Sequence, residues 1–565
     1  MTSIFQFLDL PPELIIVILD QLDFRLLLIC RRVCKFIREL VDETANLVYK
    51  IELAASGNED NGHNTLPPSE KLAALKKHQM AWNNLNWTNE TEYPTAANPT
   101  TGNLWELFGN VFAQNTQEGK FVFRQLPSGL RNIPEKVWTV QPDEPSGVRD
   151  FGMDPAQDLL VLLKAPVREN PNHYIYCKTM SNGTKHPRVL HSGVIVQSQV
   201  NNLYEVSYSI QISGDFVGLL CLCAPDFHGG QGLNEFYVFN WKSGALQLNL
   251  TGLEMKSFSF MSECHAILTI LETDRQLSLL VIDFLRESAD RKAHADAEQC
   301  YTLCFPALNA HAVFFRFEIR SDPSPGWRPR QDAGVPFHTS TENRLFVVSL
   351  VGIGRWGRHF FFIAVPQKIL LAHRGAMDAE RRKLEWDEWG QETRLLDLCP
   401  ISTDFLIWQC YVFGSKFVIM EANFDEDMDF ELNRSTLLIF DFNQYALKRA
   451  LSQSASSTSD TEEPNTAVSV PGIDPSLCIT TATKLPADVF DAEVITTLPY
   501  RLSALVFEPS KAPDAVMCSE DSLITVHVRS SFNSSKDQAN TPHSSGIAMT
   551  QTQSSASSLS DAANG

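Results

Sequence analysis

The spacing of hydrophobic positions divides the chain into a helical part and a strand-rich part. Up to about residue 90, apolar residues recur at intervals of three and four, which is typical of amphipathic helices. From about 137 to 528, short runs rich in Val, Ile, Phe and Tyr alternate with Gly, Pro, Asn, Asp and Ser, as in strands joined by turns. This pattern predicts an α+β multidomain protein in which an all-α module precedes a large all-β domain.

The stretch LDLPPELIIVILDQL, residues 8–22, predicts a helix with almost no polar face. Pro11 and Pro12 suit a first helical turn, where a missing N–H costs little, and Glu13 complements the positive end of the helix dipole. The six residues that follow are apolar all the way round. A helix of this kind is buried on more than one side, so we expect one face to pack inside the module and another to meet a partner.

Three further helices are expected before residue 90. The first runs from about Leu26 to Val41, and its apolar stripe consists of Val33, Phe36, Ile37, Leu40 and Val41. The next contains NLVYKIELAA and stops near Gly57, because glycine readily ends a helix. The last is PSEKLAALKKHQMAWNNL, with Ser69 as its N-cap.

The strand-rich region shows weak internal similarity. Pairs of apolar strands recur, as in GDFVGLLCLC with EFYVFNWKSGAL and in CHAILTILETDRQLSLLVIDF. No amphipathic helix regularly separates the strands, which argues against a parallel sheet. Repeats of about 40–50 residues over this span would give about six to eight blades of a β-propeller. A pair of large β-sandwiches is the alternative.

Composition shifts set the expected boundaries. We expect a three-helix module over 1–50, a helical linker region over 51–136 and the propeller-like domain over 137–528. The Ser-rich segments 451–467 and 529–565 have few aromatic residues, so they would bury too little surface to offset their chain entropy. They are predicted to be a disordered loop and a disordered tail.

Charge and cysteine content narrow the class of protein. The 565 residues include 47 basic and 67 acidic side chains, a net charge of −20, which argues against nucleic acid as a partner and favours other proteins. No apolar stretch of about 20 residues is present, so no membrane helix or membrane partner is expected. The 12 cysteines lie among hydrophobic residues and are predicted to be free buried thiols of a cytoplasmic or nuclear protein.

Several sequences resemble catalytic or metal motifs but lack their context. GIGRWG at residues 352–357 is followed by a strand-like run instead of the helix that a dinucleotide site requires. CYTLC at residues 300–304 lacks the close cysteine pairs of a zinc site. DEDMDFE, residues 425–431, lacks the glycine of a calcium loop. We therefore expect no catalytic residues, no metal and no cofactor.

The sequence LPPELIIVILDQLDFRLLLICRRVCKFIRELV resembles an F-box. The landmarks that agree in order and spacing are Leu10, Pro11, Glu13, Leu14, Ile18, Leu19, Leu22, Leu27, Val33, Cys34, Lys35 and Phe36. One position departs from the family pattern, since Leu26 stands where a polar capping residue is usual. The second helix would then start elsewhere, with Asp23 as a possible cap.

The resemblance extends to F-box proteins common in mushroom-forming fungi, which carry a propeller-like C-terminal region. Its signs here are the segments LVYKIELAASGNEDNG, KLAALKKHQMAWNNLNW, VFNWKSG and WDEWGQETR. Beyond the first forty residues these motifs are weak.

The resemblance implies a non-catalytic substrate-recognition subunit of a Skp–cullin–F-box (SCF) ubiquitin ligase, acting in ubiquitin-dependent protein catabolism. The helices would bind the Skp-type adaptor, and through it a cullin, while the β domain recruits an unknown target protein. The adaptor-binding residues it implies are Leu10, Pro11, Pro12, Glu13, Leu14, Ile18, Leu22 and Leu27. The expected internal core consists of Val33, Cys34, Phe36, Ile37 and Leu40.

Two other functions are compatible with the sequence. An F-box scaffold would bind the adaptor but recruit no cullin, and an enzyme would use polar residues converging at the propeller axis. Target contacts cannot be assigned from the sequence. Arg355, Trp356, Trp386 and Trp389 are loop candidates, although tryptophans in a propeller more often serve packing.

Overall fold

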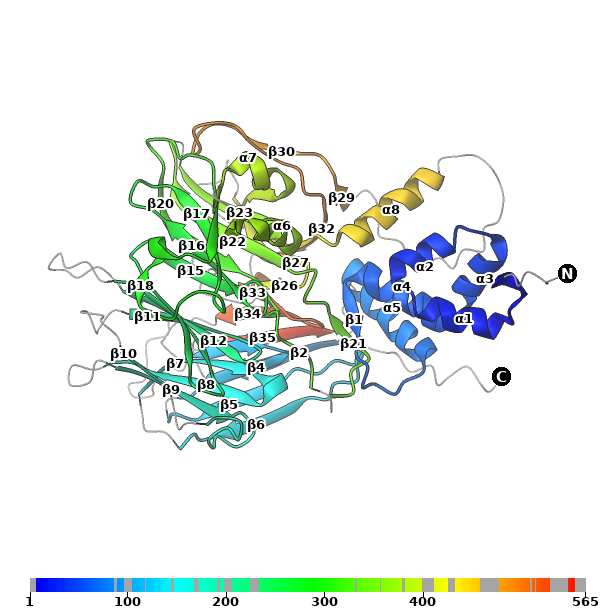
Figure 1. Ribbon diagram of the computed structural model, residues 1–565, viewed down its shortest axis with the longest axis horizontal. Helices are drawn as coiled ribbons and strands as arrows, with labels where there is room; N and C mark the ends of the chain where they lie inside the picture. The colour runs from blue at the N-terminus through cyan, green and yellow to red at the C-terminus, as the bar shows by residue number, and fades with distance from the viewer. Residues whose placement is uncertain are drawn as a thin grey trace, which may run out of the picture.

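The structure is a computed structural model in which the helices project from one side of a β-propeller (Figure 1). It describes residues 7–85, 89–95, 104–116, 118–143, 147–166, 172–190, 194–197, 206–223, 233–330, 333–355, 357–378, 382–398, 411–424, 432–457, 477–508, 511–513, 515–528 and 547–553.

The N-terminal module consists of short helices packed around a small apolar core. After the 3-10 turn η1 (Phe7–Asp9) come α1 (Pro12–Asp20), α2 (Phe24–Cys30), α3 (Lys35–Glu43), α4 (Ala45–Ser56) and α5 (Pro68–Asn84). Strand β1 (Asn58–Asp60) lies between α4 and α5 and pairs with β21 (Phe337–Thr339) of the β domain. The module is thus tied to the propeller by backbone hydrogen bonds.

The single helix predicted from Leu26 to Val41 is wrong, because two helices occupy that interval. The Asp23 carboxylate accepts hydrogen bonds from the backbone N–H groups of Arg25 and Leu26, so α2 begins before the expected start. A turn over residues 31–33 then separates α2 from α3. Arg31 donates to both carboxylate oxygens of Asp42, which holds the turn against the end of α3.

The two later helices agree with their predictions except at one cap. Gly57 ends α4 with φ of +72°, a left-handed conformation that glycine adopts without strain. Helix α5 begins at Pro68 with Pro67 in the capping position, so the assignment of Ser69 as N-cap is wrong.

In the described part of the chain, six sheets of four or five strands follow one another along the sequence. Blade one contains β3 (Trp105–Phe108), β4 (Val111–Asn115), β5 (Phe121–Gln125) and β6 (Lys136–Val140). Blade two contains β7 (Val148–Asp154), β8 (Leu159–Lys164), β9 (Asn172–Thr179) and β10 (Val194–Gln197). Blade three contains β11 (Val206–Ser213), β12 (Phe216–Cys223), β13 (Glu235–Asn240), β14 (Leu246–Thr251) and β18 (Lys292–Ala293).

The next three blades complete this consecutive series. Blade four contains β15 (Met255–Phe260), β16 (His265–Leu271), β17 (Leu277–Asp283), β19 (Cys300–Cys304) and β24 (Lys383–Leu384). Blade five contains β20 (Val313–Arg320), β22 (Leu345–Ile353), β23 (Arg358–Pro366) and β25 (Arg394–Asp397). Blade six contains β26 (Val412–Phe413), β27 (Lys416–Phe424), β28 (Leu432–Asp441), β32 (Tyr500–Phe507) and β29 (Cys478–Ile479).

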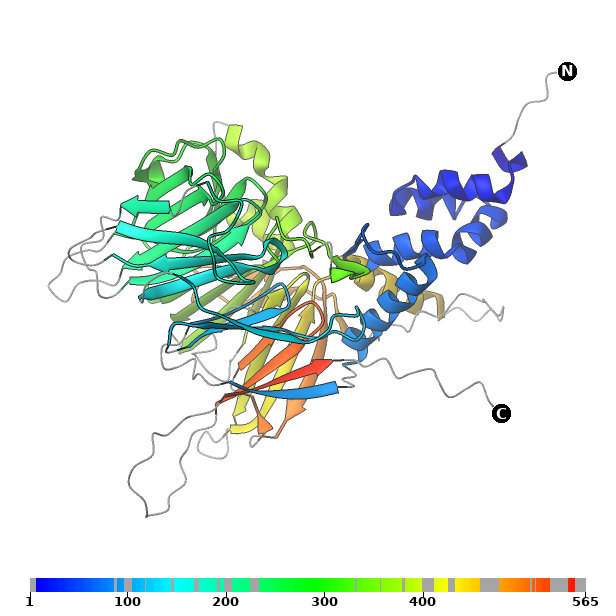
Figure 2. The ribbon, with the colours of Figure 1, turned by 90° about the horizontal axis from the view of Figure 1, so that it is seen from below.

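A seventh sheet joins the two ends of the β region. It contains β33 (Ala515–Cys518), β34 (Leu523–Val528) and β35 (Ile547–Gln553), with β2 (Asn89–Thr95) as its outermost strand. Figure 2 shows the blue strand β2 beside the red strands of this blade. Innermost strands of neighbouring blades contact one another, namely β3 with β7, β7 with β11, β11 with β15, β15 with β20 and β26 with β33. The prediction of a β-propeller is therefore confirmed and the β-sandwich alternative is wrong.

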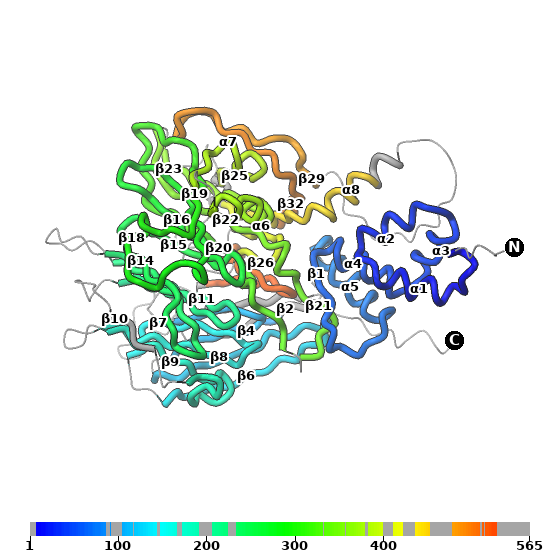
Figure 3. Tube along the Cα trace, in the orientation of Figure 1, coloured from blue at the N-terminus to red at the C-terminus, as the bar shows by residue number. Residues whose placement is uncertain are grey.

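Short helices and a β-hairpin lie outside the blades. They are η3 (Pro155–Gln157), η4 (His294–Asp296), α6 (Gln367–Ala372), η6 (Arg374–Asp378), α7 (Trp386–Trp389), η7 (Gly390–Glu392), α8 (Gln444–Ser457) and the hairpin of β30 (Thr483–Leu485) with β31 (Val494–Thr496). Helix α8 leaves blade six and reaches the N-terminal helices (Figure 3).

Three expected boundaries need correction. The interval 51–136 is not a helical linker throughout, because β2 and all of β3 to β5 lie within it. The predicted disordered loop 451–467 begins as helix, since α8 continues to Ser457, and the rest of it lies outside the described residues. The predicted disordered tail 529–565 contains β35, and its remainder also lies outside them.

The propeller core lies between neighbouring blades. One cluster of buried side chains joins blade five to blades six, seven and one, with Val347, Phe417, Met517 and Leu107 among its members. Because this cluster spans the first and last blades, apolar packing closes the ring.

Candidate functional site

Exposed apolar side chains gather on the N-terminal helices. Ten large hydrophobic side chains within residues 7–36 are exposed, whereas twelve others are spread over the rest of the described chain. The ten are Phe7, Leu8, Leu14, Val17, Ile18, Leu26, Leu28, Ile29, Val33 and Phe36. Such a concentration marks an interaction surface, and we call these ten residues the apolar surface.

The opposite faces of the same helices form the core of the module. Its buried members are Ile15, Leu19, Leu27, Ile37, Val41 and Leu47. Helix α1 therefore has two apolar faces, with Ile15 and Leu19 inside and Leu14, Val17 and Ile18 outside. This arrangement explains why its sequence has almost no polar positions.

The structure separates the residues expected to bind an adaptor into three groups. Leu14 and Ile18 are 50% and 43% exposed, and Pro11, Pro12 and Glu13 beside them are exposed as well. Leu10 and Leu22 are half-buried and pack against the module core. Leu27 is fully buried, so its assignment to the binding surface is wrong. Adaptor contact by the exposed residues stays a prediction.

The expected internal core is also only partly correct. Ile37 is buried, and Cys34 and Leu40 pack against the core from half-buried positions. Val33 is 72% exposed and Phe36 is 39% exposed, so placing them in the core is wrong. The break between α2 and α3 is the physical reason, because the stripe was drawn for one continuous helix and the turn at residues 31–33 changes which side chains face inward.

Contacts from α8 hold the module against the propeller. The Tyr445 ring meets the Phe24 ring edge-on at 5.4 Å between centroids, and Arg25 donates to the Tyr445 hydroxyl at 2.9 Å. Arg449 donates to both carboxylate oxygens of the buried Glu52 on α4 at 2.9 Å. These contacts leave the apolar surface on α1 to α3 uncovered by the described chain.

A buried ionic network joins α5 to the first and last blades. Arg131 contacts Glu520 at 2.8 Å and Asp521 at 2.5 Å, and His78 on α5 lies 3.2 Å from Asp521. The indole N–H of Trp82 donates to the Glu520 carbonyl. Burial by itself would raise the pKa of Asp521, but Arg131 and His78 beside it hold that pKa well below its usual range.

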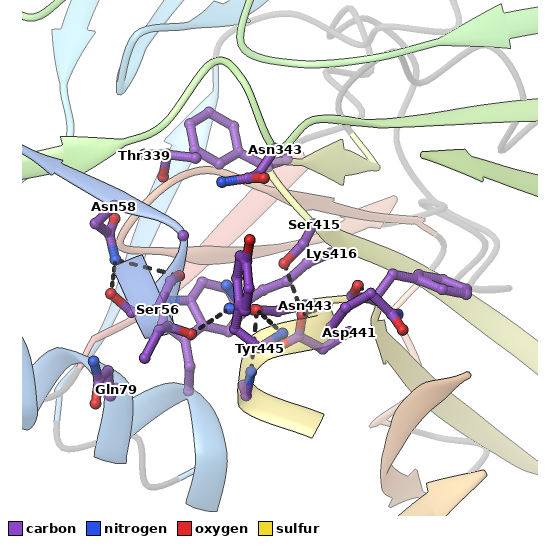
Figure 4. A pocket seen from close by; sticks show the side chains of 18 of the residues that line it. Ser56, Asn58, Gln79, Thr339, Asn343, Ser415, Lys416, Asp441, Asn443 and Tyr445 are labelled. Carbon is purple, nitrogen blue, oxygen red and sulfur yellow. Dashed lines mark hydrogen bonds between the residues drawn. The ribbon is translucent and has the colours of Figure 1, made fainter. Parts of the chain in front are cut away.

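A pocket of about 240 Å³ lies between α4, α5 and α8 and the adjoining ends of blades five to seven (Figure 4). Its labelled side chains are mostly amides and hydroxyls, with the Lys416 ammonium 5.0 Å from the Trp82 ring centroid. Asn443 donates to the Ala55 carbonyl and accepts from the Tyr445 N–H, which links α4 to α8 across the pocket. The lining offers hydrogen bonds to a polar segment of a ligand.

Other sequence candidates have structural roles or lie outside the described residues. Trp386 and Trp389 are buried, and both rings contact Phe305. GIGRWG forms the turn between β22 and β23, as expected, although Trp356 itself is not among the described residues. Cys300 and Cys304 are free thiols on β19. All of DEDMDFE lies outside the described residues.

Sequence reasoning missed a cluster of Cys264, His265 and Asp283 at one end of blade four. Within the described chain it is the one group of three such side chains whose potential metal-ligand atoms lie within 4.8 Å of one another. The Cys264 sulfur lies 3.2 Å from His265 Nδ1, and the Ser262 hydroxyl lies 2.7 Å from the same nitrogen. Burial lowers the pKa of His265, and Arg374 and Arg286 lower it further against the opposite effect of Asp283.

Residues 7–53 match the F-box-like family. The N-terminal helices thus form an F-box-like domain, followed by a large all-β propeller. The narrower likeness to F-box proteins of mushroom-forming fungi stays a prediction. No curated protein matches the sequence.

Solved structures resemble the chain only distantly. The WD40 domain of SCAP from fission yeast is 9% identical, with 82% of this chain and 98% of that chain covered and a TM-score of 0.30. Cobalt-substituted Synechocystis ACO is 8% identical, with 46% of this chain and 56% of that chain covered and a TM-score of 0.25. Likenesses this weak carry no argument, and the propeller is established by its own strand order.

Proposed function

We propose that this protein is the substrate-recognition subunit of an SCF ubiquitin ligase. The F-box-like domain would bind a Skp-type adaptor, and through it a cullin, while the propeller recruits a target protein. The protein would contribute binding surfaces and no catalytic residues of its own. The cytoplasm or nucleus is the compartment we propose, with neither nucleic acid nor membrane as a partner.

The observation that carries the proposal is the apolar surface of the F-box-like domain. Its members come from η1, α1, α2, α3 and the turn before α3, within the segment that matches the F-box-like family. Aliphatic side chains on one face of a small helical unit suit a partner that binds helices in a groove. Figure 1 shows α1 and α3 at the end of the molecule far from the propeller, so a partner bound there would leave the propeller free for a second partner.

Adaptor binding by the full-length protein tests the proposal directly. Leu14→Asp or Ile18→Asp should weaken binding of a purified Skp-type adaptor by at least about thirtyfold, since loss of a central contact costs about 2 kcal/mol or more. Calorimetry measures the affinity. Val313→Asp is the matched control, because Val313 is also exposed, at 59%, but lies on the propeller.

The control variant should bind like the unchanged protein. Adaptor binding that survives both Leu14→Asp and Ile18→Asp would show that the apolar surface has another role. Melting temperatures of the variants should stay close to that of the parent, because both side chains point away from the module core.

A ubiquitination assay with a reconstituted complex distinguishes the ligase function from the scaffold alternative. If the adaptor-bound protein recruits a cullin, a neddylated cullin with its RING partner should form ubiquitin chains on proteins captured by the propeller. Adaptor binding without cullin recruitment would favour a scaffold.

A further inference from the structure

A second cavity, of about 50 Å³, lies at the propeller axis. Residues of the innermost strands β3, β7, β11 and β15 line it, together with the residues at the end of β20. Its polar lining includes Glu106, Gln211, Ser259, Arg320 and Asp322. Five blades therefore converge on one small polar space.

A loop at residues 321–327, which we call the axial loop, closes one end of this space. The backbone of this loop makes hydrogen bonds to blades six and three. The Gly414 N–H donates to the Asp322 carbonyl at 2.7 Å, and the Gly326 N–H donates to the Ser213 hydroxyl at 3.2 Å. A Cβ atom on Gly326 would lie 2.4 Å from the Gly214 nitrogen, so the loop approaches β11 as closely as only glycine permits. This packing fixes the loop side chains that face the cavity.

Several polar groups in the cavity lining have no partner in the described chain. The hydroxyls of Ser259, Ser321 and Ser324 make no hydrogen bond, although these residues are only 1%, 7% and 7% exposed. The Arg320 Nε–H is also unpartnered within those residues. Buried polar groups normally have hydrogen-bond partners. Several groups without a partner around one cavity therefore indicate that a polar species binds there.

Acids outnumber bases among the ionisable side chains of the lining, which are Glu106, Asp322 and Arg320. Glu106 and Asp322 accept no hydrogen bond from the residues that the structure describes. Burial, with the neighbouring carboxylates of Asp322 and Asp150, raises the pKa of Glu106 well above its usual value. Burial also raises the pKa values of Asp322 and Asp150 to about 7. Burial is the largest cause of each shift, so each acid loses its proton less readily in the folded protein until a cation lies beside it.

We propose that this axial cavity binds a primary ammonium group, with Glu106 and Asp322 as the charged acceptors and the serine hydroxyls as further acceptors. An ammonium has three N–H donors and no acceptor, which matches the carboxylates and serine hydroxyls of the lining, while the Arg320 Nε–H is left to a bound water. A cavity of this size holds a few waters or the end of an alkylammonium chain.

Two other ligand classes fit the lining less well. An anion would meet the carboxylates of Glu106 and Asp322, with Arg320 as the one guanidinium among the residues that line the cavity. A directly ligated metal ion needs several carboxylates close together. Within the described chain these acids do not form such a group, since the one set of three close potential ligands lies at Cys264, His265 and Asp283.

The ammonium could belong to a lysine side chain of a bound protein or to a free amine. Solvent reaches the acceptors, because Glu106, Arg320 and Asp322 are half-buried and not sealed. The inference does not depend on adaptor binding, since no residue of the F-box-like domain lines the cavity.

Binding of n-propylammonium chloride to the full-length protein tests the inference. Ligand-observed NMR should detect saturable binding that equal sodium chloride does not reproduce and that 1-propanol, a neutral molecule of similar size, does not compete. Glu106→Gln and Asp322→Asn should each weaken the binding at least tenfold. Glu118→Gln, at an exposed carboxylate in blade one, should not change it.

The pH dependence provides a second measurement. Binding should strengthen from pH 6 to pH 8, because the cation requires charged carboxylates and the free acids hold protons near pH 7. The charged groups that act on them are Arg149, beside Asp150, and Arg320 and Arg344, beside Asp322, and arginines stay charged over this range.

A second pair of probes distinguishes the sources of the ammonium. If Nα-acetyl-lysine methylamide binds and its norleucine analogue does not, a protein lysine is the source. If propylammonium binds and the lysine derivative does not, a free amine is the source. Absence of propylammonium binding, or binding unchanged by both Glu106→Gln and Asp322→Asn, would overturn the inference. The Glu106→Gln variant should fold normally, because the substitution removes an ionisable group from a buried site. A loss of propylammonium binding in this variant would therefore not be caused by a loss of structure.

Discussion

His173, on β9 of the propeller, is a buried residue whose titration bears on acid stability. Its side chain has no exposed surface, and its nearest polar contact is the Cys221 sulfur at 3.7 Å from Nε2. Burial lowers the pKa of His173 to about 4, whereas an unfolded chain would protonate it near pH 6.5. The folded state therefore excludes a proton that the unfolded state binds.

We expect the free energy of unfolding to fall as the pH drops from about 6.5 towards 4. The unfolded chain takes up more protons in that window, and His173 alone can account for a loss of about 3 kcal/mol. His173→Gln should flatten this part of the stability profile, measured by urea unfolding at several pH values. His63→Gln, at an exposed histidine, should leave the profile unchanged. An identical slope in both variants would contradict the assignment.

The residue assignments of the F-box-like domain show what hydrophobic spacing can predict. Leu14 and Ile18 were placed on an outward face of α1 because the helix is apolar all round, and the structure exposes both. The prediction for Val33 is wrong because the spacing assumes one helix, and the turn at residues 31–33 is not visible in that spacing. The outward assignment of Leu27 came from the F-box resemblance and not from the spacing. The carboxylate of Asp23, three positions before Leu26, was the available signal for an earlier start.

At the scale of elements, the apolar inner strands were readily predicted and the polar outer ones were not. Strands such as β12, β16 and β22 have continuous apolar runs, because sheets cover both of their faces. Blade one was read as linker, since its strands have four or five residues and include polar positions such as Glu106 and Arg124. The sequences of β2, NETEYPT, and β35, IAMTQTQ, carry no strand signal strong enough to place them.

Strand β35 should matter for stability, contrary to the expectation of a disordered tail. A chain that ends at residue 529 loses the pairing of β35 with both β34 and β2. We expect its melting temperature to fall by several degrees, since each kcal/mol shifts the melting of a large domain by roughly 2–4 °C. A chain that ends at residue 553 keeps the strand and should melt like the parent. Equal melting of the two truncations would show that β35 adds nothing.

The axial cavity illustrates a limit of sequence reading at the element scale. Glu106, Ser259 and Asp322 are far apart along the chain and belong to no motif. They meet only because β3, β15 and β20 are each the innermost strand of a blade. Convergence at an axis depends on blade register, which hydrophobic patterns do not specify.

At the scale of the whole molecule, the buried ionic network fixes the helices relative to the propeller. Asp521→Asn would remove one of the two carboxylates that pair with the buried Arg131 and leave its charge only partly compensated by Glu520, at a cost of up to about 3–5 kcal/mol. We expect a lower melting temperature and faster hydrogen exchange in α5, with little change in α1. Mass spectrometry of the exchanged protein locates the effect.

An exposed ion pair supplies the comparison for this variant. Asp378 meets Arg286 with both side chains more than half exposed, so Asp378→Asn should change stability by less than about 1 kcal/mol. If Asp521→Asn has an effect as small as Asp378→Asn, the network does not hold the two parts together.

The seventh sheet pairs two strands that are synthesised at very different times during translation. Strand β2 leaves the ribosome soon after the F-box-like domain, but its partner β35 comes only after every other blade. The F-box-like domain can therefore fold while translation continues, as N-terminal units generally do. The pairing of β2 with β35 can form only once residue 553 has emerged, and until then the edges of β2 and β34 remain open to other chains. A nascent chain that stalls before this point would carry a folded F-box-like domain on a propeller whose seventh sheet is incomplete.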